Sequence, residues 1–243
     1  NHATLQTPFF MPIATKGAVK TLEAQEVGAL GTKIILSNTY HLMLRPGIST
    51  LKSLGGLHAM MNWNGAILTD SGGYQVFSLT DIRKLTEEGV EFQSHIDGSK
   101  HLLTPELSVD VQLAIGSDII MVLDECAPFP AERAYLRESL ERTTRWALRC
   151  KNHLEMRFED SINQENKKSK KQENNNLNPV ISQSLRSFEM TTGMSGVANG
   201  KPVISSEARD QGMKQKKPLL FAIVQGGVYE DLRAESARQL MEI

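Results

Sequence analysis

Four short apolar runs recur along the chain, each about as long as one β-strand. They cover residues 33–37, 66–69, 118–123 and 219–224. Their apolar residues are continuous and do not alternate with polar ones, which is typical of strands buried on both faces of a parallel sheet. A further apolar segment at 9–15 contains a proline, so it predicts a strand start or a bend.

Segments with helical spacing lie between these runs. The pattern predicts helices over 21–30, from 48 to 54, over 105–115, from 131 to 157 and over 230–241. The third of these is bounded by Thr104 as N-cap, Pro105 at the first helical position and Gly116 at the end. Residues 91–103 alternate instead, and predict a hairpin that turns at Asp97–Gly98. Repeated strand and helix in this order predict right-handed β-α units around a parallel sheet, an α/β fold.

Each of the four buried runs ends in a polar side chain. These side chains are Asn38, Asp70, Asp124 and Gln225. In parallel α/β folds the carboxyl ends of the strands meet at one edge, so we expect the four groups to converge. Such a meeting point predicts a functional site.

The residue types at this edge suggest which chemistry the site performs. Asp70 and Asp124 would repel one another, so the pKa of one carboxyl should rise towards neutrality and supply an acid or base. A carboxylate together with the Gln225 amide matches the donor and acceptor edge of a purine-like heterocycle. Tyr74 offers a flat face for stacking. In Ser71–Gly73, between Asp70 and Tyr74, the two glycines let the backbone approach a ligand closely. Taken alone, that tripeptide would equally suit an ordinary turn, and the tyrosine an ordinary packed ring.

Composition narrows the class of protein. With 243 residues, 40% of them hydrophobic, the chain could bury the core of one α/β barrel or of two smaller domains. No run is long enough to span a membrane and no signal-peptide pattern is present, so we expect a cytoplasmic protein. Cys126 and Cys150 show no metal-ligand spacing, and His41, His95 and His101 do not form a metal triad, so no metal site is predicted within these residues.

Charge and composition divide the chain into three parts. Residues 161–217 contain ten Lys or Arg and five Asp or Glu, a net charge of +5, whereas the remainder carries −6. This middle part is rich in Asn, Gln, Lys and Ser and predicts a disordered insertion. The expected organisation is 1–160 as the first part of a barrel, 161–217 as the insertion and 218–243 as the barrel's continuation. Because the chain starts at Asn1 and stops directly after a helical pattern, we expect a fragment of a longer protein.

Several segments together resemble one known family, the queuine/tRNA-guanine transglycosylases. The resemblance is carried by Phe10–Pro12, Asn38–Gly47, Leu68–Gln75, Gly116–Met121, Asp124–Cys126 and Gln225–Gly227. It covers essentially the whole chain apart from 161–217. The Asp-Glu-Cys sequence at 124–126 is similar to bacterial members, although Gln-Gly-Ser is common there in place of Gln225–Gly227.

The resemblance implies a modified (β/α)8 barrel of the TIM-barrel type, incomplete in this chain, and a separate zinc-binding subdomain. It also implies an enzyme, a pentosyltransferase that exchanges guanine at the tRNA wobble position for a 7-deazaguanine base in queuosine biosynthesis. The base would be 7-aminomethyl-7-deazaguanine for a bacterial member. The implied partners are tRNA, the base and a second copy in a homodimer.

The family's roles map onto this chain residue by residue. Asp70 would be the general acid and base, and Asp70, Ser71, Gly72, Gly73 and Tyr74 would form the base-binding loop, with Tyr74 stacked on the ring. Asp124 and Gln225 would hydrogen-bond the edge of the base, and Asn38 would support Asp70 or the ribose.

Other parts of the family pattern have no counterpart in these residues. The nucleophilic aspartate and the Cys3His zinc ligands would lie beyond Ile243, so we expect the 243 residues alone to be inactive. Two other interpretations are a non-catalytic RNA-binding or partner subunit of the same fold, and an unrelated barrel enzyme that acts on a small heterocycle.

Overall fold

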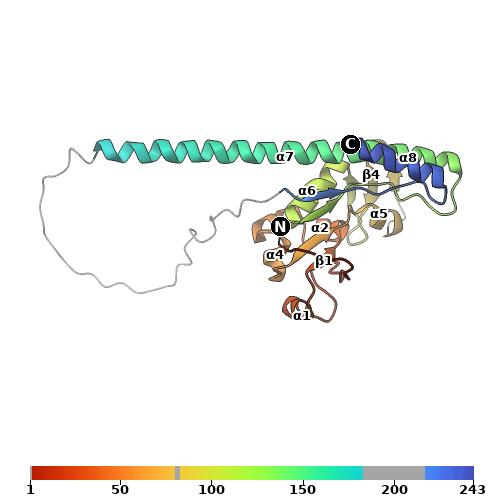
Figure 1. The fold of residues 1–243 in the computed structure, drawn as a ribbon, viewed down its shortest axis with the longest axis horizontal. Coiled ribbons are helices and arrows are strands. Elements are labelled where there is room, and N and C mark those ends of the chain that lie inside the picture. The colour runs from red at the N-terminus through yellow and green to blue at the C-terminus, as the bar shows by residue number, and fades with distance from the viewer. Residues whose placement is uncertain (1, 80–82, 183–216) are drawn as a thin grey trace, which may run out of the picture. The chain divides into compact units, whose positions relative to one another are not determined.

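The computed structural model describes residues 2–79, 83–182 and 217–243. The chain forms two units: the first comprises residues 1–156 and 217–243, and the second comprises 157–216. Both strand sheets and every candidate site residue belong to the first unit (Figure 1). No helix within the described ranges has both the length and the apolar character needed to cross a membrane.

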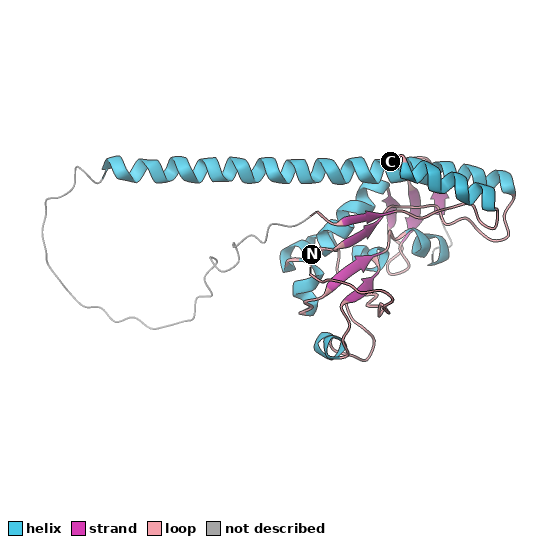
Figure 2. Ribbon diagram, viewed as in Figure 1, coloured by secondary structure: helices cyan, strands magenta, loops and turns pink. Residues whose placement is uncertain are grey.

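A parallel sheet of four strands forms the centre of the first unit (Figure 2). Its strands are β1 (Ile34–Ser37), β2 (Ala66–Thr69), β6 (Ile119–Met121) and β7 (Leu219–Phe221), in that order across the sheet. Ile34 lies opposite Ala66, and Ile119 opposite Leu219. The four apolar runs thus form the predicted parallel α/β sheet, while its closure into a barrel stays a prediction.

Eight helices are present in the described residues. They are α1 (Ala24–Ala29), α2 (Thr39–Leu44), α3 (Ile48–Leu54), α4 (Gly56–Met61), α5 (Gly73–Leu79), α6 (Pro105–Ile115), α7 (Arg133–Ser182) and α8 (Glu230–Met241). Helix α6 has the predicted ends: the Thr104 hydroxyl accepts a hydrogen bond from the Leu107 backbone N–H at 3.1 Å, and Gly116 closes the helix in the left-handed conformation. The local sequence signals are therefore sufficient to define this helix.

A second, antiparallel sheet follows α5. It contains β3 (Arg83–Leu85), β4 (Val90–Gln93) and β5 (Lys100–Leu103) in chain order. Strands β4 and β5 form the predicted hairpin, with Val90 opposite Leu103 and Gln93 opposite Lys100. The predicted Asp97–Gly98 turn lies within a loop that is longer than the sequence pattern suggested, and β3 was not predicted.

The main core lies between the parallel sheet and the helices that follow its strands. Its buried residues are Ala14, Val27, Ile35, Leu42, Leu51, Leu57, Trp63, Ile67, Val111 and Ile115. Each fully buried side chain of this kind contributes about 1.5–3 kcal/mol relative to an exposed one. A second cluster joins Leu136 and Leu140 of α7 to Leu232 of α8, which holds the last helix against the long one.

Two segments differ from the sequence expectation. Residues 9–15 form only an isolated bridge between Ile13 and Leu36, because a proline in this segment lacks the N–H that a strand ladder requires. Residues 161–182, expected to be disordered, continue α7 as helix. Glu, Lys and Gln are good helix formers, and each residue added to an existing helix gains a hydrogen bond. The rest of the predicted insertion, 183–216, lies outside the described residues.

Candidate functional site

The carboxylate of Asp70 lies at the end of β2 and accepts four hydrogen bonds. Oδ1 accepts from the backbone N–H of Thr39 at 2.9 Å and from that of Gly72 at 3.2 Å. Oδ2 accepts from the side-chain amides of Asn38 and Gln75, the latter at 2.8 Å. The Thr39 hydroxyl also donates to the Asp70 carbonyl. Asp70 is therefore held in one orientation by groups from the end of β1 and from the segment that follows β2.

The glycines after Asp70 allow this close packing. Gly72 has a φ of 84°, in the left-handed region that other residues rarely adopt, and this conformation turns its N–H towards Asp70. A Cβ on Gly73 would lie 2.8 Å from the backbone oxygen of Asp124. Gly73 thus permits α5 to begin directly against the end of β6.

A second carboxylate, that of Asp124, lies at the end of β6. Its Oδ1 accepts from the Ser71 hydroxyl at 3.2 Å, and its Oδ2 accepts from the Gln225 amide at 2.9 Å. Ser71 is fixed in turn, because its backbone oxygen accepts from Ser108 on α6 at 2.7 Å. The ends of β2, β6 and β7 are thereby joined by hydrogen bonds, so the predicted convergence of the four strand ends is confirmed.

Burial raises the pKa of both carboxyl groups. Desolvation raises the pKa of Asp70 above its usual value, although hydrogen bonds from Asn38, Thr39, Gln75 and Gly72 oppose the change. Desolvation raises the pKa of Asp124 to about 6, opposed by hydrogen bonds including those from Ser71 and Gln225, while the charge of Asp70 adds the smallest contribution. The sequence prediction of a raised pKa is correct, but its main cause is burial rather than mutual repulsion.

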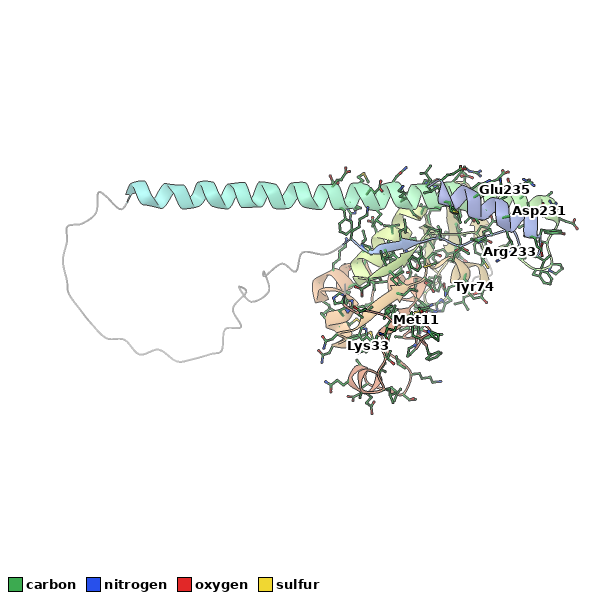
Figure 3. The ribbon with its side chains drawn as sticks, viewed as in Figure 1. Met11, Lys33, Tyr74, Asp231, Arg233 and Glu235 are labelled. Carbon is green, nitrogen blue, oxygen red and sulfur yellow. The ribbon has the colours of Figure 1, made fainter. Side chains whose placement is uncertain are left out.

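Tyr74 is the exposed member of the loop. It lies in the first turn of α5, and its side chain is 63% exposed (Figure 3). An exposed aromatic ring beside two partly buried carboxylates can stack on a flat ligand. The adjacent Ser71, Gly72 and Gly73 are buried, so only the tyrosine of this loop projects.

Two contributors to the site were not assigned from the sequence. Gln75 ends the loop that the sequence singled out, yet its amide donor to Asp70 depends on where α5 starts. Thr39 contributes a backbone N–H, for which a side-chain pattern carries no signal. The predicted support of Asp70 by Asn38 is present, and Asn38 is itself buried.

A fully buried carboxylate, Glu125, anchors the strand end behind Asp124. It accepts hydrogen bonds from the Tyr135 hydroxyl and the Arg142 guanidinium, both on α7. Its backbone N–H donates to Thr143 at 3.1 Å. Helix α7 therefore fixes the path of the chain that places Asp124.

The histidines and cysteines occupy supporting positions. The hydroxyl of the buried Tyr40 hydrogen-bonds His95 Nδ1 at 2.7 Å. Burial lowers the pKa of His41, with Lys16 and His95 adding to the effect. The pKa of the Cys126 thiol is raised, mainly by burial and further by Asp124 and Glu125. A thiol with a raised pKa is less ionised at neutral pH, which argues against Cys126 as an activated nucleophile.

Comparison with known proteins identifies the family. The family model for queuine tRNA-ribosyltransferase matches residues 1–192. The queuine tRNA-ribosyltransferase of Pelotomaculum thermopropionicum is 43% identical over 242 residues, 100% of this chain and 50% of the relative. That of Ruminiclostridium cellulolyticum is 43% identical over 242 residues, 100% of this chain and 49% of the relative. That of Symbiobacterium thermophilum is 60% identical over 150 residues, 62% of this chain and 38% of the relative.

The chain spans about half the length of the curated relatives that match it from end to end. The matched part contains the ends of β1, β2 and β6, where Asn38, Asp70 and Asp124 are found. The family model and the alignments that cover the whole of this chain therefore include these site residues. The chain belongs to the queuine tRNA-ribosyltransferase family.

Proposed function

We propose that this chain carries the base-recognition site of a tRNA-guanine transglycosylase, which exchanges guanine in tRNA for a 7-deazaguanine base. The observation that carries the proposal is the pair of partly buried, separately hydrogen-bonded carboxylates of Asp70 and Asp124 at adjacent strand ends. Two carboxylates in different environments can divide binding and proton transfer between them.

Asp124 and Gln225 suit the hydrogen-bonding edge of a guanine-like base. An ionised Asp124 accepts hydrogen bonds from the ring N–H and the exocyclic amine, and the Gln225 amide donates to the ring carbonyl. In this structure the amide donates to Asp124 at 2.9 Å. Binding of the base therefore replaces one internal hydrogen bond by several to the ligand, and Tyr74 stacks on the face of the ring.

Asp70 suits proton transfer. Because its pKa is raised, Asp70 gains and loses its proton at a pH closer to neutrality than an exposed aspartate does. A carboxylate nucleophile attacks C1′ of the target nucleotide, and the bond from C1′ to guanine breaks as guanine takes up the proton of the Asp70 carboxyl group, which is left ionised. Asp70 then accepts the proton of the incoming base, which attacks C1′ and releases the nucleophile. We place that nucleophile outside this chain, so the isolated 243 residues should not turn over.

The finer features implied by the family remain part of the proposal. They are the substrate 7-aminomethyl-7-deazaguanine, a homodimer, a cytoplasmic location and a structural zinc ion with ligands outside this chain. The cysteines of this chain do not suit that zinc site: the Cys150 thiol is buried with its pKa raised to about 12, and Cys126 also has a raised pKa.

The proposal is tested by measuring the exchange of labelled guanine into tRNA, with the whole protein of which this chain forms part. Asp70→Asn should reduce exchange by at least about 100-fold, the usual minimum contribution of a general acid or base. Its unfolding transition should stay cooperative. Asp97→Asn, in the exposed hairpin loop, is the matched control and should leave exchange unchanged. Unchanged exchange in Asp70→Asn would remove this residue from its role, and exchange by the 243 residues alone would show that the nucleophile lies within them.

A further inference from the structure

We propose that His2, His58 and Asp118 form a binding site for a divalent transition metal ion such as Zn²⁺. One ligand atom from each residue lies within 4.8 Å of the other two. Asp118 directly precedes β6, whereas Asp124 follows it, so this site lies at the opposite end of the strands from the base-recognition site. Lys33, before β1, and Tyr74, after β2, mark these two ends in Figure 3.

The spacing of two of the ligand atoms already suits a zinc ion. His58 Nε2 lies 3.5 Å from Asp118 Oδ2. Ligands bound tetrahedrally at about 2.0–2.2 Å from zinc lie roughly 3.3–3.5 Å from one another. His2 Nδ1 lies 2.7 Å from the other carboxylate oxygen, Asp118 Oδ1, and its ring stacks on that of His58 with 3.9 Å between centroids, so the His2 side chain must turn for both histidines to bind one ion. His2 can make this adjustment, because its side chain is 39% exposed while that of Asp118 is 11% exposed.

The hydrogen bonds of His58 prepare its Nε2 for a metal. Nδ1 lies 3.1 Å from the backbone oxygen of Trp63, so in the neutral ring Nδ1 carries the hydrogen and Nε2 presents a lone pair. Nε2 is buried, and among the described residues its one polar contact is with Asp118 Oδ2 at 3.5 Å. A metal-binding histidine usually donates its other ring N–H to a carbonyl or carboxylate in this manner.

Asp118 completes the arrangement. Its Oδ2 also accepts from the backbone N–H of Ile67 at 2.9 Å, which fixes the carboxylate against β2. A neutral His58 would thus point a lone pair at a carboxylate oxygen, and a cation between them would satisfy both atoms. Two imidazoles and one carboxylate favour zinc or a similar transition metal over Mg²⁺ or Ca²⁺, which prefer oxygen ligands.

The site would join three distant parts of the chain. His2 belongs to the N-terminal segment, His58 to α4 and Asp118 to the start of β6. His2 and Trp63, whose backbone oxygen lies beside His58 Nδ1, also line a surface hollow. A bound ion would therefore stabilise the folded protein, since metal binding to a site absent from the unfolded chain adds to the free energy of unfolding.

The competing explanation is a protonated His58 that forms an ion pair with Asp118 without a metal. Two titrations of metal-stripped protein separate these explanations. Binding of Co²⁺ is followed by its visible d–d absorption, and binding of Zn²⁺ is measured in a calorimeter. His58→Ala and the exposed His2→Ala should each bind one equivalent of metal fewer than the unmodified protein. If that equivalent still binds, its affinity should fall by more than about 10–100-fold, the loss typical of an outer-sphere partner. His101→Ala is the matched control, because His101 bonds Ser99 in the hairpin.

Two further measurements make the result decisive. Zn²⁺ should raise the melting temperature of the unmodified protein and of His101→Ala, and not that of His58→Ala. In ¹⁵N NMR spectra the Nε2 resonance of His58 should move when Zn²⁺ is added. Equal metal uptake by all four proteins, or no uptake by the unmodified protein, would overturn the proposal. Because uptake is compared between variants, a zinc ion bound elsewhere does not affect the outcome, and the proposal does not rest on the transglycosylase activity.

Discussion

Asp124 gives the folded state a stability that depends on pH. Its pKa is raised to about 6 in the folded protein, from an ordinary value near 3.8. The folded state therefore binds the proton more tightly than the unfolded chain, so this group's contribution to stability falls as pH rises from about 4 to about 6. A difference of about two pKa units corresponds to about 3 kcal/mol. Above pH 6 the buried negative charge destabilises the fold by this order of magnitude.

Asp124→Asn should remove that pH dependence. Above pH 6 its free energy of unfolding should exceed that of the unmodified protein by up to about 3 kcal/mol, and the difference should shrink below pH 4. Urea unfolding at a series of pH values measures this. Asp97→Asn should behave oppositely, because Ser99 lowers the pKa of Asp97 to about 2 and ionisation there favours the fold. A pH-independent difference for Asp124→Asn would contradict the assignment.

Gly73 tests how closely the two strand ends must approach. In Gly73→Ala the new Cβ would meet the Asp124 backbone oxygen at 2.8 Å, so α5 or the end of β6 must move. Overpacking of this kind costs about 1–3 kcal/mol and should also weaken binding of guanine, the proposed ligand. Gly28→Ala is the control: the nearest atom lies at 3.9 Å on Trp63, and the helix favours alanine. Calorimetric titration with guanine and urea unfolding compare the two variants.

At the residue scale the sequence predicted side chains better than backbone groups. Asn38, Asp70, Asp124 and Gln225 were found because each directly follows an apolar run, and parallel strands place such positions at one edge. The Thr39 N–H could not be found, since its direction depends on the start of α2 and not on the type of its side chain. The dominance of burial in both pKa shifts likewise requires the packing around the carboxylates.

At the element scale, the Thr104 cap at the N-terminus of α6 makes a measurable contribution to the stability of the fold. Its hydroxyl accepts from the Leu107 N–H, one of the donors that have no partner within the helix. Thr104→Ala should lower the free energy of unfolding by about 1 kcal/mol, and Thr104→Ser should restore most of it. Urea unfolding of the pair gives the comparison. An equal loss in both variants would mean that the methyl group, and not the hydroxyl, stabilises this turn.

Elements with strong local signals were predicted. The apolar runs and the capped α6 carry their own start and stop residues. By contrast, α2 and α5, which are six and seven residues long, were not predicted, although α1 and α3 of the same lengths were. Helix α7 continues past the composition change near residue 160, because its packed first part provides the nucleus from which polar helix formers extend.

At the scale of the whole molecule, the first unit should not need residues 157–216. The two ends of this segment are close together in the first unit, where Lys217 Nζ lies 3.9 Å from Glu155 Oε1. A linker of about six residues can span about 20 Å, which is more than such a pair requires. Shortening a loop from about 60 to about 6 residues lowers its closure cost by about 2 kcal/mol.

Replacement of residues 157–216 by a six-residue Gly-Ser linker should therefore leave the first unit folded, with a free energy of unfolding equal to that of the unmodified protein or up to about 2 kcal/mol higher. Affinity for guanine, the proposed ligand, should be unchanged, because Asp70, Asp124 and Gln225 all lie in the first unit. Urea unfolding and calorimetric titration measure both. A control that inserts the same linker within the exposed loop after Asp97 should also fold. Loss of cooperative unfolding in the shortened protein alone would show that the second unit is needed to assemble the site.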